Sequence, residues 1–280
     1  MMNNVIETRG VTYKIEHLHF RKRNPFCLFL HGFLGTSADF YHIIPHLTDY
    51  INPVLLDHLG HGESGKPDRV ERYETPELVS DIVEIIKSFT DKPLFLAGYS
   101  MGGRLALQTA IRHPELLRGL ILESANPGIA DADKKSDRKN EDQMRAAEIE
   151  SNLAQFVRKW NNMPLFQSGH MTDEIKDPGR LRQLRIFQEM QEPGGVAAML
   201  KGFGAGLMPA VSQYKLQQIS HPVLLIAGGR DQKFVDIQRR MLDKFPNAHL
   251  EIIAESAHRV HIDHPIAYIH ALRAFFADQK

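Results

Sequence analysis

The sequence has one cysteine, no excess of either charge and no long apolar run, and each absence excludes a class of protein. A single cysteine, Cys27, rules out an intramolecular disulfide and a multi-cysteine metal site, and its apolar surroundings indicate a buried core residue. Lysine plus arginine and aspartate plus glutamate number 34 each, so no overall field attracts nucleic acid or an anionic membrane. Any selection of a charged ligand must come from local charge.

Signals for export or membrane insertion are also missing. The first residues, MMNNVIETRG, have neither the basic end nor the apolar core of a secretion signal. No stretch reaches the roughly 18 uninterrupted apolar residues of a membrane-spanning helix. We therefore expect a cytoplasmic protein without membrane insertion that acts on a small molecule.

Short apolar segments alternate with longer helical patterns along the 280 residues, which is typical of an α/β fold with a mostly parallel sheet covered by helices on both faces. Apolar runs predict strands over 13–20, 26–30, 53–56, 94–97, 117–123, 223–227 and 249–253. Apolar residues at helical spacing predict helices over 76–89, 102–113, 234–245 and 265–277.

The pattern changes between residues 126 and 220, where no strand is predicted and helical periodicity dominates. Within it, the mixed charges of 131–145 are typical of a solvated helix face. We predict a core in two parts, 1–125 and 221–280, and a helical lid over 126–220. The lid would cover the carboxyl ends of the strands, where open α/β sheets bind ligands.

Ser100 lies in a G-x-S-x-G pattern between a predicted strand and a predicted helix. Although such a short pattern is weak alone, in this context a sharp turn would lift the serine hydroxyl above the sheet, and Gly98 and Gly102 would leave room for the turn. Serine becomes reactive when a histidine takes its proton and a carboxylate orients that histidine. Asp231 and His258 follow two later strands; each alone could be an ordinary loop residue, but their order and placement predict a triad.

The glycine-flanked loop 31–35 also follows a strand. It can aim the Phe33 amide at the same point as the Met101 amide and so form an oxyanion hole, with His31 in a structural role. Histidine pairs such as His58 and His61 lack the remaining ligands of a zinc site. We therefore expect neither a metal nor a cofactor.

Arg104 follows Ser100 by one helical turn in an otherwise apolar segment. A guanidinium close to the sheet loses hydration and needs an anionic partner. Either Glu123 or Asp57 supplies that partner, or the substrate does.

Together with DHLGHGES at 57–64, these motifs resemble the α/β-hydrolase superfamily over nearly the whole chain. GYSMGGRLAL, LESANPGI, KWNNMPLFQS and GFGAGLMP, which begin at residues 98, 122, 159 and 202, further resemble the 2-succinyl-6-hydroxy-2,4-cyclohexadiene-1-carboxylate synthases of menaquinone biosynthesis. That resemblance implies a lyase that eliminates pyruvate from a substrate bearing several carboxylates. It also implies that His258, oriented by Asp231, sets up Ser100 to abstract a carbon-bound proton while the Phe33 and Met101 amides receive negative charge.

The same resemblance implies roles in substrate binding. Arg104 and Arg138 would clamp carboxylates, and Tyr99 and Trp160, the only tryptophan, would line the pocket. The family carries a further lid arginine where this chain has Gln188; either Arg185, one turn earlier, takes that role, or the third carboxylate is held more weakly.

Two other functions fit the same residues. A serine esterase or thioesterase would act on a small carboxylated substrate, and a lidded receptor would bind a small molecule without turnover. Convergence of Arg104, Arg138 and Arg185 on Ser100 would favour a polyanionic substrate, whereas an ion pair between Arg104 and Glu123 would favour the esterase.

Overall fold

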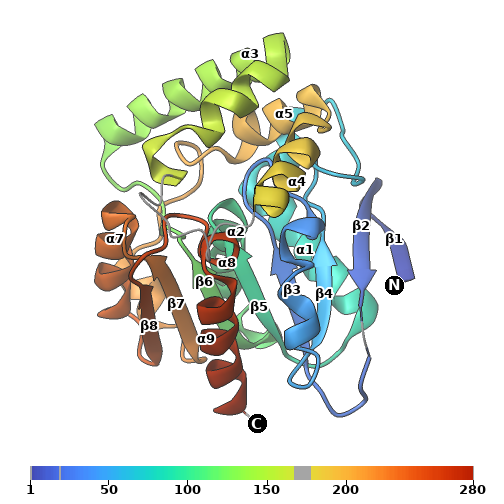
Figure 1. Cartoon of the computed structure of the whole chain (residues 1–280), viewed down its shortest axis with the longest axis vertical. Coiled ribbons are helices and arrows are strands. Elements are labelled where there is room, and N and C mark those ends of the chain that lie inside the picture. Colours follow the sequence, from blue (N-terminus) through green and yellow to red (C-terminus); the bar gives the residue numbers. More distant parts are fainter. Residues whose placement is uncertain (1, 19, 167–177, 280) are drawn as a thin grey trace.

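The computed structural model describes residues 2–18, 20–166 and 178–279, which form a single eight-stranded sheet with helices on both of its faces (Figure 1). The strand order is β1-β2-β4-β3-β5-β6-β7-β8; β2 pairs antiparallel with β1 and β4, and all other neighbours are parallel. This confirms the predicted fold class. The strands are β1 (Met2–Thr8), β2 (Val11–His17), β3 (Phe26–Leu30), β4 (Asn52–Leu56), β5 (Leu94–Tyr99), β6 (Leu117–Glu123), β7 (Val223–Gly228) and β8 (Ala248–Ile253).

Nine α-helices and five short 3-10 helices are found in the described residues. The α-helices are α1 (Thr75–Phe89), α2 (Met101–Arg112), α3 (Ala132–Asn161), α4 (Pro178–Glu189), α5 (Pro193–Phe203), α6 (Gln213–Gln217), α7 (Gln232–Leu242), α8 (Val260–Asp263) and α9 (Pro265–Ala277). The 3-10 helices are η1 (Ser37–Phe40), η2 (Ile44–His46), η3 (Val70–Tyr73), η4 (Pro114–Leu116) and η5 (Pro164–Phe166). None of the helices in this part of the chain is both long and apolar enough to cross a membrane.

The predicted strands and helices are present, with their ends displaced by a few residues; the strand expected over 13–20 is β2, which ends at His17. The strand β1 has largely polar residues, and no apolar pattern in the sequence predicts it. A two-residue turn joins β1 to β2, and both turn residues, Arg9 and Gly10, have positive φ angles of 50° and 78°. That combination closes a tight antiparallel hairpin, but Arg-Gly is not among the residue pairs that usually indicate one.

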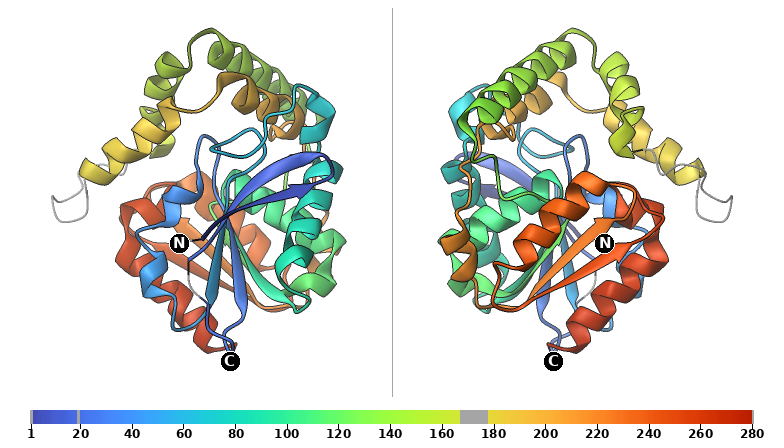
Figure 2. Two further views of the ribbon diagram at one scale, coloured as in Figure 1. Left: turned by 90° about the vertical axis from the view of Figure 1, so that its right-hand side faces the viewer. Right: turned by 90° about the vertical axis from the view of Figure 1, so that its left-hand side faces the viewer.

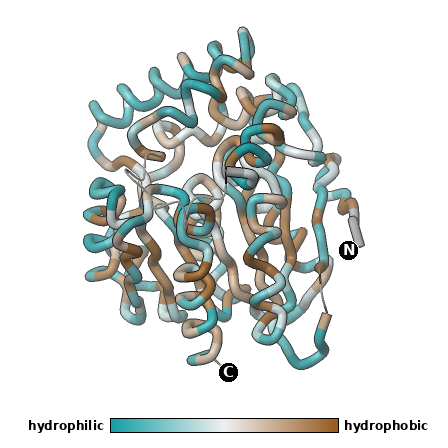
Figure 3. Tube along the Cα trace, in the orientation of Figure 1, coloured by the Kyte–Doolittle hydropathy of each residue, from teal (hydrophilic) through white to brown (hydrophobic). Residues whose placement is uncertain are grey.

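Alternate residues of the central strands pack into two cores on opposite faces of the sheet. In β6, Leu120 and Leu122 join the core beneath α1, α2 and α7, whereas Ile121 joins the core beneath α9 and the 3-10 helices η1 and η2. Figure 2 shows the helices on either side of the sheet, and Figure 3 shows the strands as the most hydrophobic part of the chain. Because helices cover both faces of the sheet, the strands expose polar groups only at their ends. The polar residues of the site lie in the loops there.

Between β6 and β7, the described chain forms only helices, and α3 and α5 pack together above the carboxyl ends of the strands (Figure 1). The 30-residue α3 is interrupted at Asn152, whose φ of −159° and ψ of 88° are not helical and whose side chain accepts from the Gln155 amide at 2.9 Å. The apolar face of α3 packs on α5 and on Leu34 of the core. The outer face of α3 is hydrophilic, as its mixed charges predict (Figure 3).

Candidate active site

Ser100, the predicted reactive serine, lies on a strained turn between β5 and α2. Ser100 has a φ of 49° and a ψ of −105°, a conformation that residues with a side chain rarely adopt. A Cβ atom on Gly98 would lie 2.4 Å from the Gly102 carbonyl oxygen, and one on Gly102 would lie 2.1 Å from the Leu30 carbonyl oxygen. Both positions therefore require glycine, because the turn presses the start of α2 against β3 and β5.

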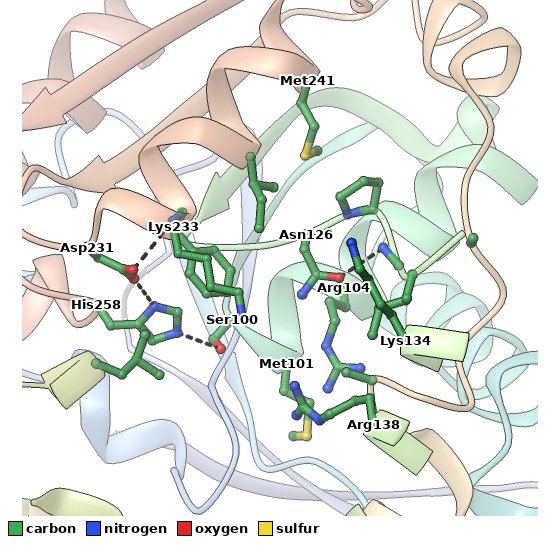
Figure 4. Close-up of a pocket in the computed structure, with 18 of the residues that line it drawn as sticks. Ser100, Met101, Arg104, Asn126, Lys134, Arg138, Asp231, Lys233, Met241 and His258 are labelled. Atoms are coloured by element: carbon green, nitrogen blue, oxygen red, sulfur yellow. Dashed lines mark hydrogen bonds and ion pairs between the residues drawn. The ribbon is translucent and has the colours of Figure 1, made fainter. Parts of the chain in front are cut away.

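Two later loops bring the other two residues of the predicted triad to this serine. The Nε2 atom of His258 lies 3.0 Å from the Ser100 hydroxyl oxygen, and its Nδ1 atom lies 2.6 Å from Oδ2 of Asp231 (Figure 4). Asp231 also caps α7 by accepting from the Phe234 amide, so its carboxylate is held in place. The three residues can relay a proton from Ser100 to His258, with Asp231 orienting the imidazole.

The loop after β3 and the start of α2 present two main-chain amides to the cavity beside Ser100. In the described part of the chain, neither the Phe33 amide nor the Met101 amide donates a hydrogen bond to the protein, and both residues line the cavity. His31 holds the loop from behind, because its Nε2 atom accepts from the His58 amide at 3.0 Å and its Nδ1 atom lies 2.8 Å from the Gly32 carbonyl oxygen. Two free donors near one reactive group are the requirement for an oxyanion hole.

A cavity of about 1310 Å³ opens between the sheet and the helices above it, and Ser100 and His258 line its wall. Its lining contains nine basic and four acidic residues, so the cavity favours an anionic occupant. The basic residues are Arg104, Lys134, Arg138, Arg145, Arg230, Lys233, Arg240, Lys244 and Arg259, and the acidic residues are Asp131, Glu141, Asp231 and Asp243.

Arg104 lines this cavity and has no carboxylate partner among the described residues. Its side chain is 7% exposed, donates to the Phe203 carbonyl oxygen at 3.2 Å and lies over the Phe203 ring, 5.0 Å from the centroid. Burial, reinforced by the positive charge of Arg138 and opposed by Asp142, lowers the pKa of the Arg104 guanidinium to about 10. The site thus holds a cation whose charge the surrounding protein does not neutralise.

Neither carboxylate considered as a protein partner for Arg104 pairs with it. Glu123 is fully buried and accepts from the ring and the amide of His261 at 2.8 and 3.1 Å. Asp57 accepts from the amides of Ser37 and Glu63 at 2.7 and 2.9 Å and so holds together the loops after β3 and β4. Of the alternatives that the sequence left open, the substrate remains the candidate partner for Arg104.

Arg138 also lines the cavity, from α3, but carboxylates already surround it. Its Nε atom lies 2.8 Å from Oδ1 of Asp142 and 3.5 Å from Oε2 of Glu141. Asp142 is buried and also accepts from the Gly206 amide at 3.2 Å. Arg138 therefore presents a partly neutralised charge, unlike Arg104, although the two guanidinium groups lie on the same side of Ser100 (Figure 4).

Arg185 does not join these residues, contrary to the expectation that it replaces a lid arginine. Its side chain is 48% exposed on α4, pairs with Glu189 at 2.9 Å and does not line the cavity. Gln188, one turn later on the same helix, is buried and accepts from the Asn161 side chain at 2.7 Å. Residues three apart on a helix are offset by about 60° around its axis, so at the edge of the buried face of α4 Gln188 points toward α3 while Arg185 points to solvent.

The two predicted aromatic residues both line the cavity. Trp160 packs against Phe33 and Phe166, with ring centroids 5.4 and 5.5 Å away. Tyr99 lies under the loop 31–35 that follows β3, where a Cβ atom on Gly32 would come within 2.4 Å of the Tyr99 ring. Burial raises the pKa of the Tyr99 hydroxyl well above its ordinary value, so the ring serves this wall as a neutral group.

Sequence reasoning missed Arg145 and Arg259, which also bring guanidinium groups to the cavity. Arg145 pairs with Glu141 at 2.6 Å and lies over the Trp160 ring, whereas Arg259 is 8% exposed and stacks on Phe166. The available signal was the position of Arg259 directly after the triad histidine, where a side chain must lie close to the reaction centre.

His58 and His61, the pair considered above as possible zinc ligands, are buried and form hydrogen bonds with the main chain. Nε2 of His58 donates to the His31 carbonyl oxygen at 3.0 Å, and Nε2 of His61 accepts from the Leu34 amide at 3.3 Å. Burial lowers the pKa of His61 to about 4 and those of His31 and His58 well below 6.5. Across the described ranges, three or more potential metal ligands nowhere gather in one place.

Comparison with known proteins gives one consistent match. Residues 27–265 match the family model described as alpha/beta hydrolase fold. A Bacillus subtilis (strain 168) protein, provisionally named 2-succinyl-6-hydroxy-2,4-cyclohexadiene-1-carboxylate synthase, is 35% identical over 241 residues, which cover 84% of each chain. A Serratia proteamaculans (strain 568) protein with that synthase name is 27% identical over 91% of this chain and 94% of its own. The solved structure of MenH from S. aureus is 31% identical, covers 95% of this chain and 98% of its own, and superposes with a TM-score of 0.86.

Proposed function

Since the chain belongs to the α/β-hydrolase fold family, we propose that it is a 2-succinyl-6-hydroxy-2,4-cyclohexadiene-1-carboxylate synthase. The enzyme is a lyase that eliminates pyruvate from 2-succinyl-5-enolpyruvyl-6-hydroxy-3-cyclohexene-1-carboxylate. The observation that carries this function is the buried Arg104, which lacks a carboxylate partner among the described residues and shares the cavity of Ser100. A site that keeps an unneutralised cation beside its reactive hydroxyl suits a substrate that is itself an acid.

The reaction requires a base next to the proton at ring carbon 2. His258 Nε2 takes the Ser100 proton, and the resulting oxygen removes the carbon 2 proton, which lies next to the carbonyl of the succinyl group. Asp231 stabilises the imidazolium that forms and fixes its orientation. Ser100 therefore acts as a base in this proposal, not as a nucleophile.

The electron pair released at carbon 2 has a defined path. It first moves onto the succinyl carbonyl oxygen, where the amides of Phe33 and Met101 can receive the negative charge. It then forms the double bond between carbons 2 and 3, the existing double bond shifts to carbons 4 and 5, and the bond from carbon 5 to the enolpyruvyl oxygen breaks. The released enolate gains a proton and becomes pyruvate, so atoms and electrons balance.

Three carboxylates on the substrate need cations, and the cavity supplies them. Arg104 is the strongest candidate because a guanidinium fork matches a carboxylate and no protein carboxylate occupies it in the described structure. Arg138 contributes positive potential, although Asp142 shares its charge. We further propose that residues 126–220 form the lid that excludes water above this site and that Tyr99 and Trp160 line its apolar wall.

The test is pyruvate release from the cyclohexene substrate, followed by coupling to lactate dehydrogenase and NADH. We expect turnover by the unmodified chain and a fall of about a thousandfold or more in Ser100→Ala, whose other cavity residues are intact. A serine esterase would instead hydrolyse 4-nitrophenyl esters faster than it releases pyruvate, and a receptor would bind the substrate without either reaction. Either of these results would refute the lyase.

A further inference from the structure

The residue after the triad histidine places a second guanidinium in the cavity, and this group forms no ion pair with a described residue. Arg259 is 8% exposed, begins α8 as its N-cap and lines the cavity together with His258. Long charged side chains are rarely buried without a paired charge, because loss of hydration is costly. A buried arginine beside His258 should therefore be paired with an anion, either from the protein or from a ligand.

Contacts from the segment above the sheet hold the Arg259 guanidinium in one orientation. Its Nη2 atom donates to Oδ1 of Asn161 at 2.8 Å, and Asn161 donates in turn to Oε1 of Gln188 at 2.7 Å. The guanidinium carbon lies only 3.9 Å from the centroid of the Phe166 ring. Both partners are neutral, so they fix the plane of the fork without pairing its charge.

No carboxylate in the described part of the chain forms an ion pair with Arg259. The charge of Arg259 acts on the pKa of two carboxyls, those of Asp39 and Asp263. Asp39 accepts a hydrogen bond from the Thr36 amide at 3.4 Å, and Asp263 accepts one from the Ala257 amide at 2.9 Å. Burial raises the pKa of both carboxyls, to about 6 for Asp39, and the Arg259 charge only partly opposes that rise. Both acids are engaged elsewhere, and a separate anion is needed to meet the fork.

We propose that Arg259 binds one of the carboxylates of the substrate, as a second cationic anchor beside Arg104. The inference rests on the proposed function, because it takes the three carboxylates from that substrate. Arg104 lies one turn after Ser100 on α2, whereas Arg259 directly follows His258. The two guanidinium groups thus come from separate segments, and each segment also contains a triad residue. Carboxylates bound to both arginines would therefore fix the position of the substrate relative to Ser100 and to His258.

The alternative is that Arg259 only fastens α3 to the loop of His258. The main chain already fastens the adjoining 3-10 helix η5 to this loop, since the His258 amide donates to the Leu165 carbonyl oxygen at 3.2 Å. A purely structural Arg259 would affect folding and turnover but not the affinity for carboxylates. Affinity for charged ligands therefore separates the two roles.

The probes are 2-succinylbenzoate, which carries the two carboxylates of the product on an aromatic ring, and pyruvate, which carries the third. Their dissociation constants would be measured by calorimetry with the full chain, its Arg259→Gln and Arg259→Lys variants, and Arg273→Gln as the matched control. Arg273 also stacks on an aromatic ring, that of Tyr50, and also donates to an oxygen, that of His46, but it does not line the cavity.

We expect Arg259→Gln to weaken binding of at least one probe by about tenfold to a hundredfold, with a larger change in KM than in kcat, because a charged hydrogen bond is lost. Arg259→Lys should recover part of that loss, and Arg273→Gln should bind both probes like the unmodified chain. Affinities for both probes within threefold of the unmodified chain would overturn the assignment, even if stability or turnover fell. If Arg259→Gln does not fold, Arg259→Met keeps the aliphatic stem on the Phe166 ring and takes its place.

The proposed function and this inference can fail separately. Absence of pyruvate release by the unmodified chain would refute the lyase, whereas the probe affinities would still decide whether Arg259 binds a carboxylate.

Discussion

Replacing Arg104 by methionine should make the protein more stable and much less active. The guanidinium is buried without a carboxylate partner among the described residues, and burial lowers its pKa from the ordinary 12.5 to about 10. At about 1.4 kcal/mol for each factor of ten in an equilibrium constant, that difference means that the charge costs the folded state about 3 kcal/mol. Methionine keeps the length of the side chain and removes the charge.

Two favourable contacts offset part of that gain. The hydrogen bond to the Phe203 carbonyl oxygen contributes about 1 kcal/mol, and the desolvated stacking on the Phe203 ring contributes about 2 kcal/mol, of which a contact between the methionine sulfur and the same ring restores about 1 kcal/mol. The net expectation for Arg104→Met is therefore an increase of about 1 kcal/mol in the free energy of unfolding. For a chain of this size, that raises the melting temperature by about 2 to 3 °C.

Activity should change in the opposite direction, because a substrate carboxylate would face the cavity without its cation. Losing one partner of a buried charge pair costs about 2 to 5 kcal/mol, so kcat/KM for pyruvate release should fall by about thirtyfold or more. Arg112→Met on the same helix is the matched control, since Arg112 is exposed and does not line the cavity.

Urea titration and thermal melts measure the first effect, and pyruvate release measures the second. A decrease in the free energy of unfolding would refute the reasoning about stability, because Arg104 would then support the fold. Pyruvate release within twofold of the unmodified chain would refute its role in binding the substrate.

Three further predictions follow from single contacts. Asp231→Asn should retain the fold and lose about four orders of magnitude in kcat, because an amide cannot hold the imidazole in the required tautomer; unchanged kcat would contradict the triad. Gly102→Ala should lower the melting temperature by well over 5 °C or prevent folding, since its Cβ atom would lie 2.1 Å from a carbonyl oxygen of β3; an unchanged melt would show that the turn can relax. Because burial lowers the pKa of His61 to about 4, the neutral ring is favoured in the folded state, and its contribution to stability is lost as the pH falls from about 6.5 toward 4. The stability of the unmodified chain relative to His61→Gln should drop by about 2 kcal/mol between pH 7.5 and 5, as measured by urea titration at both pH values, and a constant difference would contradict the buried neutral histidine.

Local patterns in the sequence were sufficient to predict most of the sheet. Parallel strands buried on both faces are continuous apolar runs, so β3 and β6 appear in the sequence with the same bounds as in the structure. The strand β1 escaped prediction because it is an edge strand with polar residues, and its pairing depends on a turn at Arg9 and Gly10 that only backbone geometry identifies. The apolar periodicity of β1 is weak because little of the strand packs into the core, as Val5 is 70% exposed and Ile6 is only partly buried.

The grouping of Ser100, Asp231 and His258 could also be predicted, because each follows a strand and parallel strands end at one edge of the sheet. The pairing of the charged residues could not. Sequence spacing does place Arg138 four residues before Asp142 on one helix face, which is a sufficient signal for that ion pair. By contrast, Arg104 meets Phe203, which lies 99 residues away in the chain, and Arg259 meets Asn161, 98 residues away.

The sequence by itself therefore determined the fold, the strained serine turn and the order of the proposed triad, since each depends on residues within one strand, loop or helix. Only the tertiary structure decided which cations remain without a counter-charge in the cavity. The physical reason is that the cost of a buried charge depends on every group packed around it, and those groups come from distant parts of the chain. The arginine beside Ser100 was visible in the sequence, but its freedom to bind an acid is a property of the folded protein.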